Sequence, residues 1–126
     1  MSLNFVLKWY KRIPPIHRDL ELVPYEGRFW TPNEVLAEVK RGTEDGRRLQ
    51  SLLEAGKFTD ETTLKELAKR RLLKILKDLP EGIGIGTFSG RVYSKEDLIK
   101  LVKEERDVGR ILIEQELKMI REELGI

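Results

Sequence analysis

The spacing of hydrophobic residues along the chain predicts three helices in its first two thirds. One is expected between Thr31 and Gly42, and a second between Thr43 and Gly56, each with apolar side chains on one face. A serine or threonine before each apolar stretch supplies an N-cap, and Glu34 completes a capping box with Thr31. The longest helix is expected from about Asp60 to Leu79. Its apolar stripe consists of Leu64, Ala68, Leu72, Ile75, Leu76 and Leu79.

Short apolar runs around turn residues predict two β-hairpins. The first joins residues 20–23 to 28–30, and the second joins residues 83–88 to 91–93. At the N-terminus, residues 4–13 alternate Phe5, Leu7 and Trp9 with other types, which favours a strand. A short amphipathic helix is the alternative there, and the prolines that follow end either element.

The second hairpin and the sequence after it repeat the first. Gly90 lies 63 positions after Gly27, and residues 90–117 match residues 27–54 at seven of 28 positions. Average residue usage would give roughly two matches by chance. The identical pairs are Gly27/Gly90, Arg28/Arg91, Val39/Val102, Lys40/Lys103, Gly46/Gly109, Arg47/Arg110 and Leu49/Leu112. Self-similarity of this kind indicates a repeated structural unit.

The two copies differ where the first has the helix break Gly42-Thr43. The second has Glu105-Arg106, two good helix formers, so the pattern fits one fused helix from Lys95 to Leu124, bent at Gly109, and leaves open whether one helix or two forms. The predicted fold class is therefore α+β and mostly helical, with two hairpin–helix–helix cassettes joined by a central helix. Within one domain, 1–126, the N-terminal strand takes 1–18, the cassettes 19–56 and 82–126, and the connecting helix 57–81.

Composition narrows the functional classes. The chain has no cysteine, which excludes disulfides, zinc fingers and thiol catalysis. Its net charge of +2, from 24 basic and 22 acidic residues, neither requires nor forbids nucleic acid. Many charges with few Asn and Gln are typical of thermophile proteins. No apolar run is long enough to span a membrane, and no signal peptide is evident, so a cytoplasmic protein is expected.

No constellation of catalytic residues stands out. His17 is the only histidine and is interpreted as a surface turn residue. Gly82, Gly84 and Gly86 lack the spacing of a nucleotide-binding loop and suit a strand that another element approaches closely. Carboxylates lie on helix surfaces, three or four residues from Lys or Arg. The sequence therefore predicts no enzyme, no cofactor and no metal.

The C-terminal helix supplies the first functional hypothesis. Ile113, Leu117, Ile120 and Leu124 follow spacings of four, three and four, as in the seam of a helix pair. A second face carries Val108, Ile111, Leu112 and Met119, which suffices to dock the helix onto its own domain. We therefore expect a non-catalytic interaction or assembly module, a homo-oligomer whose interface is the first face, with a further protein partner that the sequence does not name.

A nucleic-acid-binding protein is the alternative hypothesis. In it, helices within residues 44–79 and the following hairpin form a winged-helix-like surface. Its phosphate contacts would be Arg70, Lys74 and Lys77, with Arg71 as a further candidate and Arg91 on the hairpin. Separately, the repeated Gly-Arg places Arg47 and Arg110 at equivalent positions. This pair indicates either a pseudo-twofold crossing of helices from the two cassettes, with the arginines paired to acids such as Asp45 or Glu105, or an anion site.

Overall fold

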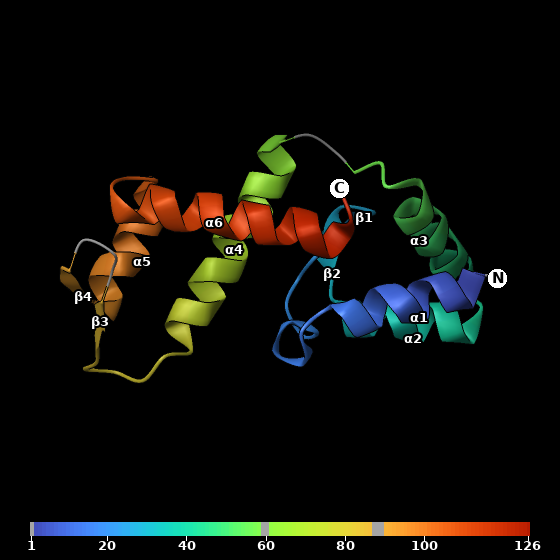
Figure 1. The fold of residues 1–126 in the computed structure, drawn as a ribbon, viewed down its shortest axis with the longest axis horizontal. Coiled ribbons are helices and arrows are strands. Elements are labelled where there is room, and N and C mark those ends of the chain that lie inside the picture. The colour runs from blue at the N-terminus through green and yellow to red at the C-terminus, as the bar shows by residue number, and fades with distance from the viewer. Residues whose placement is uncertain (1, 59–60, 87–89) are drawn as a thin grey trace. The chain divides into compact units, whose positions relative to one another are not determined.

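A computed structural model describes residues 2–58, 61–86 and 90–126 (Figure 1). The chain is mostly helical, with two small antiparallel hairpins. It divides into two compact units. Unit 1 consists of Met1–Thr63 and Met119–Ile126, and unit 2 consists of Leu64–Lys118. The predicted α+β class is confirmed in this form.

Unit 1 begins with a helix, followed by a hairpin and two more helices. The hairpin pairs β1 with β2 in antiparallel register, with Val23 opposite Trp30. Both residues of its turn, Glu26 and Gly27, have positive φ, as the tight turn of a two-residue hairpin requires. The elements are α1 (Ser2–Arg12), a 3-10 turn (Pro15–His17), β1 (Val23–Tyr25), β2 (Arg28–Trp30), α2 (Pro32–Arg41) and α3 (Glu44–Ala55).

The predicted N-terminal strand is wrong, because residues 2–12 form helix α1. Val6, Trp9 and Ile13 are buried, and their spacing of three and four is that of one helix face. Phe5, which the alternating pattern grouped with Trp9, is exposed instead. The indole nitrogen of Trp9 also donates a 2.7 Å hydrogen bond to the backbone oxygen of Glu123. The burial of these side chains and this hydrogen bond explain why the segment is a helix and not a strand.

The helix ends in unit 1 follow the sequence closely. Thr31 and Glu34 form the predicted capping box at the start of α2. The side chain of Thr43 accepts a hydrogen bond from Gly46 N at the start of α3. Gly42 and Gly56 end the two helices in the left-handed conformation, which glycine adopts without steric cost. These predictions are confirmed.

Unit 2 contains a helix, a hairpin and two further helices. They are α4 (Glu61–Lys77), β3 (Gly84–Gly86), β4 (Val92–Ser94), α5 (Lys95–Glu104) and α6 (Val108–Leu124). Leu64 opens the part of α4 that belongs to unit 2, and α6 belongs to it as far as Lys118. The ammonium group of Lys95 closes the end of α4, since it donates 2.8 Å hydrogen bonds to the carbonyls of Lys77 and Leu79. The predicted cap Thr59 and turn residue Ser89 lie outside the described residues.

A single helix from Lys95 to Leu124 is not formed. The chain breaks between α5 and α6, where Glu105 and Asp107 both have positive φ. Glu105 is a good helix former, but its carboxylate forms ion pairs with Lys65 and Lys69 of α4. These contacts favour a turn that the local sequence does not, at the position where the first copy has Gly42.

Both pairs of consecutive helices cross where a glycine lies on the preceding helix. A Cβ at Gly46 would overlap the carbonyl group of Glu38 in α2 and lie 2.9 Å from Val39 N. A Cβ at Gly109 would overlap the carbonyl group of Leu101 in α5 and lie 2.7 Å from Val102 N. The close approach expected at these glycines is therefore made by the preceding helix of the same unit. Each glycine faces its own unit.

We expect Gly46→Ala and Gly109→Ala each to lower the free energy of unfolding by about 1–3 kcal/mol, because the added methyl group forces the helices apart. Alanine has about 1 kcal/mol more helix propensity than glycine, so a net loss would isolate the steric effect. Denaturant unfolding measures it. Gly86→Ala is the control, since a Cβ there would meet nothing within 4 Å among the described residues, its immediate neighbours aside. Glycine variants as stable as the control would contradict the close crossings.

Candidate functional site

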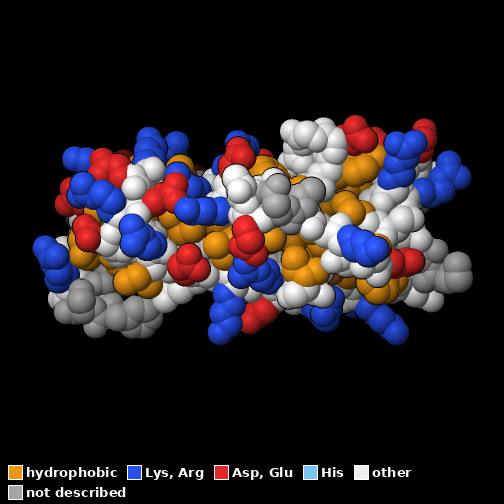
Figure 2. Space-filling model, turned by 90° about the horizontal axis from the view of Figure 1, so that it is seen from above, with side chains coloured by type: hydrophobic (Ala, Val, Ile, Leu, Met, Phe, Trp, Pro, Cys, Tyr) orange, Lys and Arg blue, Asp and Glu red, His pale blue; other side chains and the backbone are white. Residues whose placement is uncertain are grey.

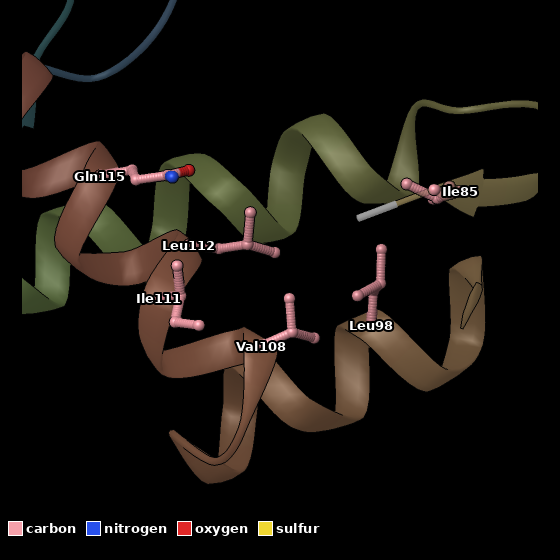
Figure 3. A pocket seen from close by; sticks show the side chains of 7 residues that line it. Ile85, Leu98, Val108, Ile111, Leu112 and Gln115 are labelled. Atoms are coloured by element: carbon pink, nitrogen blue, oxygen red, sulfur yellow. The ribbon is translucent and has the colours of Figure 1, made fainter. Parts of the chain in front are cut away.

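An apolar groove lies on unit 2 between the hairpin, α5 and α6. Its volume is about 390 Å³, and we call it the α6 groove. Figure 3 shows Leu98, Val108 and Leu112 turned toward a common space, with Ile85 on the opposite side. The lining residues are Ile85, Gly86, Leu98, Val108, Ile111, Leu112 and Gln115.

The elements around the groove hold its walls in place. Leu98 is buried on α5, one turn after the Ser94 cap that fixes the start of this helix. Gly109 lets α6 approach α5 closely enough for Val108 and Leu112 to line one side. Ile111 stands at the rim with 52% of its surface exposed. Large apolar side chains exposed beside an apolar groove are typical of binding surfaces.

The predicted interface face of the C-terminal helix points inward. Ile113, Leu117, Ile120 and Leu124 are between 0% and 4% exposed within the single chain. Their burial removes the reason for assigning them to a contact between chains. The second face of the helix, expected to dock inside the domain, carries the exposed residues Ile111 and Met119. The spacing revealed both faces correctly but not which of them meets solvent.

The basic residues proposed for nucleic-acid binding have mixed environments. Arg70, Lys74, Lys77 and Arg91 are exposed, whereas Arg71 is buried. Lys74 forms an ion pair of 3.0 Å with Asp78. Figure 2 shows Lys and Arg side chains beside Asp and Glu across the face in view, with no uniform basic patch. Since the units divide between Thr63 and Leu64, α3 and most of α4 belong to different units, and neither unit contains both.

Arg47 and Arg110 are not brought together inside either unit. Arg47 lies on α3 in unit 1, and Arg110 lies on α6 in unit 2. Arg110 Nε donates a 3.3 Å hydrogen bond to the backbone oxygen of Glu105, just after the end of α5. A cation at a helix C-terminus is favourable, which gives Arg110 a local role. The expected partner Asp45 instead accepts a 3.3 Å hydrogen bond from Tyr25.

Electrostatics at the junction of α5 and α6 support the turn. Lys65 and then Lys69 hold the pKa of Glu105 below its usual value, because both donate hydrogen bonds to its carboxylate. A carboxylate of lowered pKa contributes stability above its unfolded pKa and loses it as pH falls through the folded value. The contribution of these ion pairs to stability is small, because Glu105 and the two lysines are partly exposed to solvent.

Sequence reasoning missed a buried ion pair. Arg71 of α4 is 1% exposed, and its Nε lies 2.8 Å from Oε2 of Glu116 on α6, which is also buried. On a helical wheel of α4, Arg71 lies between the apolar face and the basic face. The sequence signal for this pair was Glu116, an acidic residue directly before the apolar residue Leu117 on α6.

His17 also differs from its interpretation as a surface residue. It is half-buried, and its Nδ1 lies 2.8 Å from Oε2 of Glu123 in unit 1. A pocket of about 280 Å³ lies beside this pair, lined by Arg12, Ile13, Pro14, His17, Met119, Glu122 and Glu123. The pair joins residues 106 positions apart, which sequence spacing could not indicate.

Other chemistry finds no support among the described residues. Outside the undescribed positions 1, 59–60 and 87–89, no three His, Asp or Glu side chains gather as metal ligands. In the same part of the chain, no helix has the length and apolar character needed to cross a membrane. Gly84 and Gly86 lie in β3, and a side chain at Gly84 would press on Val92.

Comparison of the chain with protein-family models, curated proteins and solved structures finds no match. Function is therefore inferred from the site alone.

We expect Glu116→Leu to lower the free energy of unfolding by about 3–5 kcal/mol, because Arg71 loses a buried counter-charge. The double variant Arg71→Met/Glu116→Leu should recover most of this loss, since both side chains are then apolar and of similar length. Denaturant unfolding of the single and double variants gives the coupling energy. Asp78→Ala, which breaks the exposed pair with Lys74, is the control and should cost under about 1 kcal/mol. Additive effects of the two buried changes would contradict the pairing.

Proposed function

We propose that the chain is a tandem of two copies of one 63-residue unit, each containing a helix, a hairpin and two further helices. The order of elements supports this proposal, since α1 corresponds to α4 as well as α2 to α5 and α3 to α6. One boundary between the units, after Thr63, coincides with the sequence period, whereas the end of the second copy, Met119–Ile126, belongs to unit 1. Under this proposal α4 is the first helix of the second copy, and not only the helix that connects the two cassettes.

Local geometry at equivalent positions supports the same proposal. α2 and α5 begin and end 63 residues apart, with side-chain caps from Thr31 and Ser94. The left-handed residues Gly42 and Glu105, which follow these helices, are equivalent. So are the carbonyl groups of Glu38 and Leu101, on which Gly46 and Gly109 lie. In each unit the C-terminal part of the first helix contacts the start of the second, since Tyr10 bonds to Asn33 and Lys95 bonds to the carbonyl of Lys77.

The two units differ in chemistry at the α6 groove. The positions of Val108 and Ile111 are occupied in unit 1 by Asp45 and Arg48. There Asp45 accepts a hydrogen bond from Tyr25, and Arg48 forms an ion pair of 2.6 Å with Glu44. A shared scaffold thus has charged side chains in one unit and an apolar groove in the other. Scaffold stability does not require this difference, so it favours a binding role for the groove.

We therefore propose a non-catalytic assembly module that associates with itself through the α6 groove. The observation that carries the proposal is the exposed apolar side chain of Ile111 at the rim of the groove. Burial of such a side chain in a contact contributes on the order of 1.5–3 kcal/mol before association costs. A cytoplasmic location belongs to the same proposal, and the absence of cysteine fits it.

Nucleic-acid binding is the second proposal, favoured by the exposure of Arg70, Lys74 and Lys77 on one helix. Acidic neighbours weaken it, since Asp78 pairs with Lys74 and Glu81 with Lys95. Binding of this kind would fall steeply with rising salt as phosphate contacts release counterions.

Sedimentation velocity over micromolar concentrations tests the first proposal. We expect the wild type to sediment as a species heavier than one chain and Ile111→Glu to sediment as a monomer, because a buried carboxylate would oppose association. Ile16→Glu is the control, since Ile16 is 82% exposed and is not among the residues that line the groove. A monomeric wild type would refute self-association, and an Ile111→Glu variant that still associates would exclude the groove.

A further inference from the structure

A row of four charged side chains runs along the exposed side of α6, next to the rim residue Ile111. Asp107, just before the helix, is followed by Arg110, Glu114 and Lys118 at spacings of three and four. All four residues are exposed. Spacings of three and four place them on neighbouring turns of one helix surface, so they form a single strip. We call it the α6 charge row.

The charges of the α6 charge row alternate in sign. The row is therefore complementary to a second copy of itself that runs in the opposite direction. From the N-terminal end the signs are negative, positive, negative and positive. If a second copy of the helix lies alongside in the opposite direction, Arg110 faces Glu114 of the partner subunit and Asp107 faces Lys118 of the partner subunit. Twofold symmetry forms each of these pairs twice. A parallel arrangement would instead place every charge beside its own like charge.

We infer that the occupant of the α6 groove is a second copy of this chain, docked with its α6 antiparallel and the twofold axis beside Leu112. This inference rests on the proposed function and specifies its partner and register. The two Ile111 side chains then lie next to the axis, where each covers the groove of the other chain. Apolar contacts supply affinity in this arrangement, and the surrounding charges select orientation and partner.

Unit 1 lacks both features of this surface. The positions equivalent to the α6 charge row are Glu44, Arg47, Ser51 and Ala55, so the second half of the row has no charge. If two copies of α3 lay antiparallel, Glu44 and Arg47 would face uncharged residues. The positions of Val108 and Ile111 are also charged there, as Asp45 and Arg48. The complementary row and the apolar side chains of the groove therefore occur together at these positions of unit 2 and not at the equivalent positions of unit 1.

Charge reversal tests the register. Arg110→Glu places two carboxylates opposite each other at both symmetric positions, and Glu114→Arg does the same with two guanidinium groups. Each variant alone should dimerise about tenfold or more weakly than the wild type, since exposed pairs contribute modestly and both change sign. An equimolar mixture should recover wild-type affinity as a heterodimer, because every altered charge then faces its opposite. Sedimentation velocity, with one variant fluorescently labelled, measures all three states.

Arg47→Glu is the matched control, because Arg47 occupies the equivalent position in unit 1, and it should dimerise like the wild type. Recovery in the mixture also shows that both variants are folded. A wild-type dimer that Ile111→Glu dissociates but both charge variants leave intact would overturn the register and retain the proposed function. Single variants that dissociate without recovery in the mixture would overturn it too. A monomeric wild type would overturn the inference together with the proposed function.

Discussion

In each unit the third helix packs backbone against backbone on the second, at Gly46 and Gly109, and the arrangement of the two helices depends on this close contact. A glycine at the crossing lets the third helix approach the second at a distance that any side chain would prevent. In unit 2 this approach brings Val108 and Leu112 to the groove wall opposite Leu98. Glycine lowers helix propensity by about 1 kcal/mol, so its use inside a helix is explained by what the close approach permits.

Much of the fold was predictable because its local determinants are strong. The caps of α2, α3 and α5 and the two hairpins are each determined by a short segment of sequence. The failures occurred where tertiary contacts decide between local alternatives. Apolar residues are so frequent in residues 4–13 that both strand and helix periods fit, and the burial of Trp9 selects the helix. Glu105 favours a helix, yet ion pairs with α4 hold it in a turn.

The candidate site was less predictable than the fold, for a related reason. Periodicity defines two apolar faces on α6, but the direction of each depends on the elements packed against the helix. Burial of Ile113 and Leu117 and exposure of Ile111 reverse the expected assignment. The ion pair between Arg71 and Glu116 had no local signal either, since it joins residues on different helices. Long-range pairs of this kind require the structure.

The proposed duplication explains why surface and scaffold can be separated in this chain. Positions with equivalent geometry in both units are caps, left-handed turns and the glycine crossings, all of which act through the backbone. Positions that differ most in chemistry, such as Arg48 and Ile111, contribute to the surface. Backbone determinants can keep one fold while exposed side chains diverge, since surface substitutions usually change stability by less than about 0.5 kcal/mol. Function is therefore best sought where the two units differ, and at the α6 groove unit 2 has the apolar side chains Val108 and Ile111 where unit 1 has Asp45 and Arg48.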